Sequence, residues 1–202
     1  MVRSIYIDLY GTVDENDFIA AIFSALSQIE SKIEKLLKLA TGLKLSVVID
    51  PITGQPTVSV SISRSERSKY LKSSIEILTS YAKKQKLLVV FDEFQEIDKY
   101  TDPGFEKRLR SHIQLQKNIG YIFSGSQKHI LSQMFNSSDR AFYQMARSYP
   151  LKLIELEQYI KWAQGLFKKR KISIASDIIT DIVESCEYQP MYIQQFLFEL
   201  WR

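Results

Sequence analysis

The stretch from Leu87 to Glu93 constrains the fold more than any other: five apolar residues in a row are followed directly by Asp92 and Glu93. A continuous run of aliphatic, β-branched and aromatic residues is typical of a central parallel strand that is covered on both faces. Ligands bind to open α/β sheets at the carboxyl ends of such strands. The sequence therefore predicts a buried central strand with two carboxylates at the ligand-binding edge of a sheet.

Two interpretations of these carboxylates stay open. An apolar strand followed by Asp-Glu has the form of a Walker B segment, in which the aspartate holds a magnesium ion and the glutamate polarises the attacking water. The alternative is a buried strand that stops at two solvated turn carboxylates, because acidic residues are common where strands end. Motifs elsewhere in the chain are needed to distinguish these two interpretations.

The composition is that of an ordinary globular protein. Apolar residues make up 45% and charged residues 25% of the 202 residues, which suits one sizeable domain with at most a small appendage. No apolar run approaches the ~18–20 residues that cross a bilayer, and a signal peptide is lacking, so we expect no membrane association and a cytoplasmic location. Cys186, His112 and His129 are too few for an internal disulfide or a zinc cluster. The net charge of +4 permits a nucleotide or nucleic acid without requiring either.

Strands and helices alternate along most of the chain. Hydrophobic periodicity predicts strands near residues 4–10, 87–92, 118–123 and 149–154, separated by helices near residues 14–41, 66–84, 105–116 and 130–135. Alternating runs around a loop with Pro and Gly predict an inserted β-hairpin at residues 43–63, whose role as a lid, a partner contact or plain structure stays open. Right-handed crossovers then imply a three-layer α/β core with a mostly parallel sheet over residues 1–154.

From residue 155 the pattern is helical only. Amphipathic segments near residues 155–168, 175–184 and 190–201 predict a small helical lid over residues 155–202.

Three pieces occur in a fixed order: the strand ending at Asp92-Glu93, a strand ending in Ser124-Gly125-Ser126, and a helical tail with Tyr188-Gln189-Pro190. Together they resemble prokaryotic, largely archaeal-type ATPases of the STAND branch of the AAA+ superfamily. The resemblance covers nearly the whole chain. It implies a P-loop NTPase sheet, incomplete at its N-terminus, followed by a helical lid.

The resemblance also implies a role for each matching residue. Asp92 would orient magnesium through water, and Glu93 would position and polarise the water that attacks the γ-phosphate. Ser124 matches the sensor 1 position, where a polar side chain contacts the γ-phosphate or the attacking water. Ser126 is a near alternative, although it could also cap the helix that follows.

Two further matches are partial. Pro190 matches the proline of a Gly-x-Pro segment that such ATPases place against the base and ribose, but Tyr188 stands at the glycine position. Arg140 follows the sensor strand in a loop where an arginine finger could lie. The alternative for Arg140 is an ordinary surface salt bridge.

The phosphate-binding loop of the family has no counterpart here. The sequence nowhere contains Gly-x-x-x-x-Gly-Lys followed by Ser or Thr, and Gly125-Ser126-Gln127-Lys128 is too short for it. In the family this loop lies upstream of the strand that begins here at Ser4. We therefore expect a fragment that does not bind ATP tightly by itself, although its full-length parent would use ATP and Mg²⁺.

In the family, a strand leads into the phosphate-binding loop, and this strand is also absent from the sequence. It would lie between the sensor strand and the last strand, residues 150–154. A gap of this kind exposes two strand edges, which proteins rarely tolerate. We expect it to be closed by direct pairing, by another chain's strand, or by loss of the last strand from the sheet.

Three functions stay open. The first is the Walker B, sensor 1 and lid portion of an ATP-hydrolysing molecular switch. The second is a complete, non-catalytic interaction module derived from an ATPase, against which the retained Asp92-Glu93 pair argues. The third is a metal-dependent nuclease using Asp92, Glu93 and Glu96, which lacks a catalytic lysine at a short spacing beyond the acids. A protein client, a homo-oligomer and contact with nucleic acid are left undecided.

Overall fold

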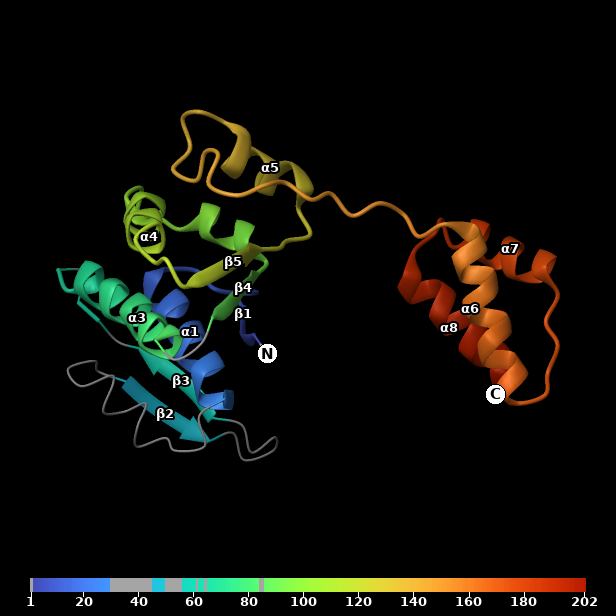
Figure 1. Cartoon of the computed structure of the whole chain (residues 1–202). Coiled ribbons are helices and arrows are strands. Elements are labelled where there is room, and N and C mark those ends of the chain that lie inside the picture. The colour runs from blue at the N-terminus through green and yellow to red at the C-terminus, as the bar shows by residue number, and fades with distance from the viewer. Residues whose placement is uncertain (1, 30–44, 50–55, 61, 64, 84–85) are drawn as a thin grey trace. The chain divides into compact units, whose positions relative to one another are not determined.

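The computed structural model describes residues 2–29, 45–49, 56–60, 62–63, 65–83 and 86–202 (Figure 1). It divides into two compact units, residues 1–148 and residues 149–202. The first contains β1 (Arg3–Asp8), α1 (Glu15–Ile29), β2 (Leu45–Ile49), β3 (Pro56–Val60), α3 (Arg67–Ala82), β4 (Leu87–Asp92), the 3₁₀ helix η1 (Phe94–Lys99), α4 (Phe105–Ile113), β5 (Ile119–Phe123) and α5 (Lys128–Asn136).

Three parallel strands form the sheet of this unit, in the order β1-β4-β5. Asp8 of β1 stands opposite Asp92 of β4, and Phe91 of β4 stands opposite Phe123 of β5. The apolar run from Leu87 is therefore the central strand, as predicted. Because all three strands point the same way, their carboxyl ends meet at one edge of the sheet.

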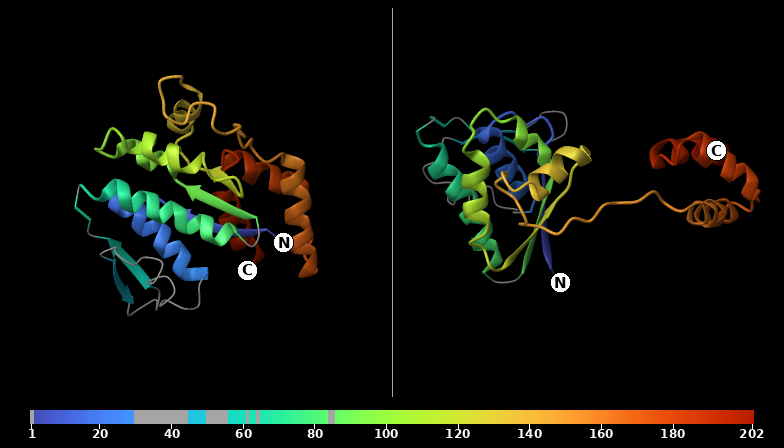
Figure 2. Two further views of the ribbon diagram at one scale, coloured as in Figure 1. Left: turned by 60° about the vertical axis from the view of Figure 1, so that its left-hand side comes forward. Right: turned by 90° about the horizontal axis from the view of Figure 1, so that it is seen from above.

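Helices cover one face of this sheet. Figure 1 and Figure 2 show α1, α3 and α4 on the same side of the strands. The inward-facing strand residues pack with them in one buried cluster, which includes Ile5, Ile7, Leu87, Val89, Phe91, Phe18, Ile22, Leu71, Leu78, Phe105 and Leu109. Burial of this apolar surface is the main stabilising term of the unit.

Within the described residues of this first unit, the other face of the sheet is open. Leu88 and Val90 of the central strand are only half-buried, and Tyr6 and Ile122 on the neighbouring strands are 57% and 47% exposed. The prediction of a three-layer core with a central strand covered on both faces is wrong for this part of the chain. An apolar run shows that both faces of a strand suit burial, but it does not show that a covering layer is present.

The inserted hairpin is confirmed. β2 and β3 pair antiparallel, with Leu45 opposite Val60 and Ile49 opposite Pro56. The first helix begins as predicted, because Asp14 Oδ1 accepts hydrogen bonds from the backbone N–H groups of Asn16 and Asp17 at 2.8 and 3.2 Å. The predicted continuation of this helix beyond Ile29, to residue 41, lies outside the described residues, as do residues 43–44, 50–55 and 61 of the predicted hairpin, 43–63.

Residues 149–154 form no strand, which corrects the prediction of a last strand there. A strand is stable only when its backbone groups pair with a neighbouring strand, and this segment has no strand partner among the described residues. Of the three expected outcomes for the gap in the sheet, the structure has the loss of the last strand.

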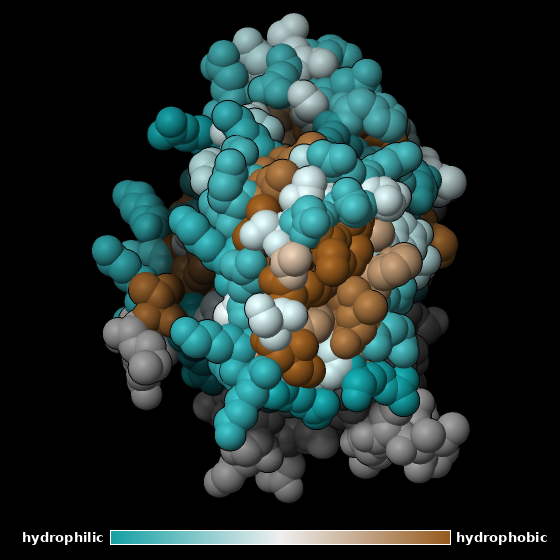
Figure 3. Space-filling model, turned by 90° about the vertical axis from the view of Figure 1, so that its right-hand side faces the viewer, coloured by the Kyte–Doolittle hydropathy of each residue, from teal (hydrophilic) through white to brown (hydrophobic). Residues whose placement is uncertain are grey.

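The second unit is a small helical one. It contains α6 (Leu156–Lys169), α7 (Ser176–Ser185) and α8 (Pro190–Trp201), close to the three predicted segments. The helices share a core of their own, made of Tyr159, Ala163, Phe167, Ile174, Ile179, Ile182, Val183, Ile193 and Leu197. Figure 3 shows apolar side chains gathered on one face of this unit, inside a rim of hydrophilic ones. Across the described part of the chain, no helix combines the length and the apolar character that a membrane span needs.

Candidate functional site

The turns that follow β4 and β5 are joined at the carboxyl edge of the sheet. The backbone N–H of Ser124 donates to the carbonyl of Phe91, and the N–H of Phe94 donates to the carbonyl of Ser124, both at 2.9 Å. These two bonds fix the turn containing Asp92 and Glu93 against the turn containing Ser124. The predicted side chains are thereby brought to one place.

Both carboxylate oxygens of Asp92 accept a side-chain hydrogen bond. Ser124 Oγ donates to Oδ1 at 2.7 Å, and the Tyr6 hydroxyl donates to Oδ2. Donors that bind the charged form, Tyr6 foremost and then Ser124, hold the pKa of the Asp92 carboxyl below its ordinary value. The same bond raises the pKa of Tyr6 to about 12. Asp92 is therefore an ionised, oriented carboxylate at neutral pH.

Tyr6 was not predicted from the sequence as a residue of this site. Its signal lies in the strand register: Tyr6 pairs with Val90 and Asp8 pairs with Asp92, so Tyr6, Val90 and Asp92 lie on the same face of the sheet. The register itself could not be deduced from the sequence.

Glu93 is held in an unusual backbone conformation. Its φ of 50° and ψ of 40° lie in the left-handed region, which non-glycine residues seldom adopt and which is found disproportionately at functional sites. Ser126 Oγ donates to Glu93 Oε2 at 2.9 Å, and Gln95 Nε2 donates to the same oxygen. These bonds, the one from Gln95 first, lower the pKa of the Glu93 carboxyl.

The structure thus unites Asp92, Glu93, Ser124 and Ser126. Ser126 does not cap the helix that follows it, because the N-cap of α5 is Gln127, without a side-chain cap bond. The Ser126 hydroxyl binds Glu93 instead. Each of the two carboxylates is therefore oriented by two donor side chains.

Arg140 is engaged elsewhere. Its Nη2 lies 2.6 Å from Asp98 Oδ1 and also pairs with Glu106. In this structure Arg140 is a salt-bridge partner within its own unit, which is the alternative to an arginine finger.

Pro190 belongs to the helical unit, where it is the first residue of α8. Tyr188, at the glycine position of the Gly-x-Pro segment, has a φ of +59°. That left-handed conformation is the one that favours glycine, so the backbone here suits the segment although the side chain differs. Contact of Pro190 with a nucleotide stays a prediction.

The donor types at the sheet edge suit magnesium. Mg²⁺ prefers oxygen ligands and in phosphate-transfer sites takes one or two carboxylates, with water and phosphate oxygens completing the shell. Asp92 and Ser124 offer such oxygens, although the described residues contain no group of three or more His, Cys, Asp or Glu side chains that could hold an ion unaided. Glu96 is directed to Lys99 Nζ, 2.7 Å away, so a three-carboxylate nuclease site including Glu96 is not formed.

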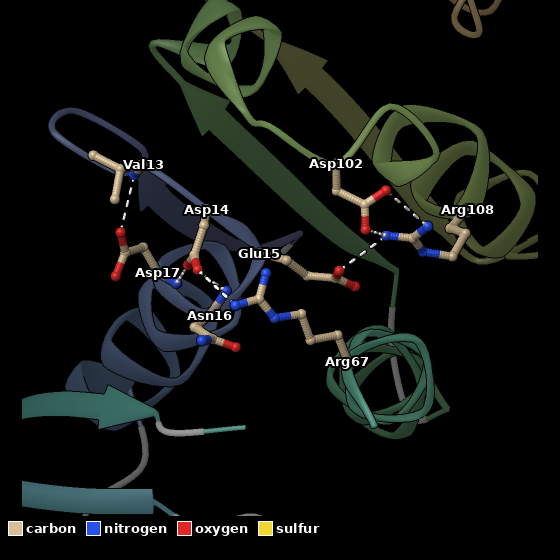
Figure 4. Close-up of polar contacts among 8 residues, drawn as sticks. All are labelled: Val13, Asp14, Glu15, Asn16, Asp17, Arg67, Asp102 and Arg108. Carbon is tan, nitrogen blue, oxygen red and sulfur yellow. Dashed lines mark hydrogen bonds and ion pairs between the residues drawn. The ribbon is translucent and has the colours of Figure 1, made fainter. Parts of the chain in front are cut away.

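A second polar cluster joins three helices at the start of α1 (Figure 4). Arg108 of α4 pairs with Glu15 Oε2 at 2.9 Å and with Asp102 Oδ2 at 2.8 Å, and Arg67 of α3 pairs with Asp14 Oδ2 at 3.1 Å. Glu15 is 1% exposed, and burial, which outweighs the attraction of Arg108, raises its pKa. No local pattern in the sequence indicates this cluster, because the three segments that it joins are far apart in the chain.

No protein-family model and no curated protein matches the chain. Among solved structures, a Walker-type ATPase of Pyrococcus abyssi is similar over 90% of this chain and 51% of its own, with a TM-score of 0.52 and 19% sequence identity. The chain has a P-loop NTPase-like fold. It spans about half the length of that ATPase. In a P-loop NTPase-like sheet, Asp92, Glu93 and Ser124 lie at the edge where such folds bind their ligands.

Proposed function

We propose that the chain supplies the metal- and water-binding half of an ATP-hydrolysing site of the archaeal-type STAND/AAA+ kind. One observation carries this proposal: Asp92 and Glu93, at the end of the central strand of a P-loop NTPase-like sheet, are each oriented by two side-chain donors. In this role Asp92 orients Mg²⁺ through water, Glu93 polarises the attacking water, and Ser124 acts as the sensor on the neighbouring strand.

The phosphate-binding half is proposed to come from a segment beyond these 202 residues. Support comes from the sheet, in which β5 pairs with β4 on one side only among the described residues. The face with Tyr6, Leu88, Val90 and Ile122 is also open. A strand, phosphate loop and helix would pair along β5 and cover this face. They would thereby remove an exposed edge and place backbone N–H groups beside Asp92.

The helical unit is proposed to be the lid of the site. Its three helices and the left-handed backbone at Tyr188 before Pro190 suit a segment that lies against the base and ribose. In this proposal ATP and Mg²⁺ bind tightly only when both halves are present. A protein client, a homo-oligomer, contact with nucleic acid and a cytoplasmic location stay predictions.

The deciding experiment is isothermal titration of ATP-Mg²⁺ into the 202-residue chain and into a version extended upstream to include the expected phosphate loop. We expect tight binding only for the extended version. In that version Glu93→Gln should keep binding and stop turnover, whereas Glu157→Gln, an exposed glutamate on α6, should change neither. Tight binding by the 202-residue chain, or undiminished turnover in Glu93→Gln, would contradict the proposal.

A non-catalytic interaction module is the second candidate, favoured by the lack of a Gly-x-x-x-x-Gly-Lys loop in the sequence. An extended version that binds no ATP would support it.

A further inference from the structure

We propose that Gln95 is a positioning residue for Glu93, and that the glycine at residue 125 leaves the space in which its amide contacts Glu93. The inference deepens the proposed function, on which it rests for the role of Glu93 toward water. The contacts themselves do not depend on that function.

Gln95 is fully buried, with 0% of its surface exposed. Its Nε2 donates to Glu93 Oε2, while its Oε1 has no hydrogen-bond partner among the described residues. A buried amide oxygen without a partner is destabilising. If this position served packing alone, methionine, which has a similar size and no such oxygen, would make the protein more stable. The hydrogen bond to Glu93 explains why an amide side chain occupies this buried position.

Gly125 provides the space for this amide. A Cβ at residue 125 would overlap Gln95 Oε1 and would lie 3.0 Å from Gln95 Cδ. The atoms that such a Cβ would meet are the end of a flexible side chain, so the Gln95 amide would have to shift from the position in which it contacts Glu93. Gly125 is not among the residues with a positive φ, so its lack of a side chain is explained by this close approach and not by backbone conformation.

The turn after β5 therefore serves both carboxylates. Ser124 donates to Asp92, Gly125 admits the amide of Gln95, and Ser126 donates to Glu93. Both side-chain donors of Glu93 reach Oε2, and no described residue donates to Oε1. One oxygen is anchored, which leaves the other in a defined direction as an acceptor for water.

The first test needs only the 202-residue chain. The Glu93 carboxyl is titrated by carbon NMR in the unaltered chain and in Gln95→Met, with Gln133→Met, an exposed glutamine on α5, as the matched control. We expect Gln95→Met to raise the midpoint for Glu93, to leave Asp92 nearly unchanged because its donors are Tyr6 and Ser124, and Gln133→Met to shift neither. An unchanged Glu93 midpoint in Gln95→Met would overturn the inference.

The second test examines the contact with Gly125. Gly125→Ala should raise the Glu93 midpoint when Gln95 is present, and should add little in a Gln95→Ser background, where the amide that it displaces is gone. An equal effect of Gly125→Ala in both backgrounds would contradict the inference. Should Gln95→Met not fold, Gly125→Ala alone provides the titration, since it displaces the amide without removing it.

Kinetics in the upstream-extended version separate this inference from the proposed function. Gln95→Met is expected to lower kcat for ATP hydrolysis about 10- to 100-fold with little change in KM, as is typical when a reacting group is misplaced. Hydrolysis with an unchanged kcat in Gln95→Met would overturn the role of Gln95 while the function stands. If the extended version hydrolyses no ATP, the proposed function fails and the NMR titration still decides whether Gln95 positions Glu93.

Discussion

Ser124 Oγ donates a 2.7 Å hydrogen bond to Asp92 Oδ1, although the two residues lie 32 positions apart in the chain. The bond connects the ends of neighbouring parallel strands. With the bond from Tyr6 to the other oxygen, it leaves Asp92 no freedom to rotate without losing a partner. The protein's own hydrogen bonds thus fix the direction of this carboxylate, and fixed groups act most effectively on a reacting centre.

Ser124→Ala should raise the pKa of Asp92 and reduce stability in a pH-dependent way. Because the folded pKa of Asp92 is lowered, its contribution is present above the unfolded pKa of about 3.9 and is lost as the pH falls through the folded pKa. The difference in unfolding free energy between Ser124→Ala and the unaltered chain should therefore shrink below about pH 4. Urea denaturation at pH 7 and pH 3 measures it, with the exposed Ser138→Ala as control. A difference that does not change with pH would count against this linkage.

Asp92→Asn should lower the pKa of Tyr6 from about 12 toward the ordinary value of about 10. The physical reason is that the phenol proton is held by the carboxylate, which an amide replaces only weakly. Carbon NMR of labelled tyrosine across alkaline pH measures the effect. Asp177→Asn, an exposed aspartate of the helical unit, serves as control. A Tyr6 midpoint that stays near 12 in Asp92→Asn would show that another group raises the Tyr6 pKa.

Arg108→Met should be strongly destabilising, by about 3–5 kcal/mol, because it leaves the buried Glu15 carboxylate without its cation. The exposed pair Lys72–Glu76, 3.8 Å apart, offers the control, and Lys72→Met should cost less than about 1 kcal/mol. Thermal or urea unfolding compares the two. Similar losses for both variants would mean that the buried pair is worth no more than a surface one.

Glu15→Gln tests the same cluster through pH. Burial raises the folded pKa of Glu15, so its contribution to stability is present below the unfolded pKa and is lost as the pH rises through the folded pKa. Glutamine stays neutral and does not undergo this loss. The stability of Glu15→Gln relative to the unaltered chain should therefore improve as the pH rises from about 4 to 7, as unfolding curves at several pH values would show. A relative stability that falls over this range would contradict the raised pKa.

Ile122→Lys should reduce self-association of the 202-residue chain without unfolding it. Ile122 is 47% exposed on β5, next to a strand edge that has no partner among the described residues, and such edges promote pairing with other chains. Light scattering behind size exclusion, over a concentration series, compares the variant with the unaltered chain. An unaltered chain that stays monomeric at every concentration would contradict the prediction.

Phe167→Ala should destabilise the helical unit by about 3–5 kcal/mol, since Phe167 is 3% exposed in its core. Phe196→Ala removes the same group from a side chain that is 58% exposed and should cost no more than about 0.5 kcal/mol. Urea denaturation followed by circular dichroism measures the unfolding free energy of each variant. Equal effects would mean that the core of this unit is not where the structure places it.

Much of the fold could be predicted because its signals are local. The apolar run ending at Asp92 predicted the central strand, helical spacing predicted α3 and the three helices of the second unit, and alternation predicted the hairpin. The meeting of Asp92, Glu93 and Ser124 also followed, since parallel strands end at the same edge of a sheet.

The sequence by itself thus determined the order of the elements and the type of most of them, because periodicity and turn chemistry act over a few residues. Only the tertiary structure decided which face of the sheet is covered and that residues 149–154 form no strand, since a strand depends on a partner that can lie far away in the chain. It alone decided the contacts of Asp92 with Tyr6, of Glu15 with Arg108 and of Gln95 with Gly125. Each of these depends on register and close packing between distant segments, which no local pattern records.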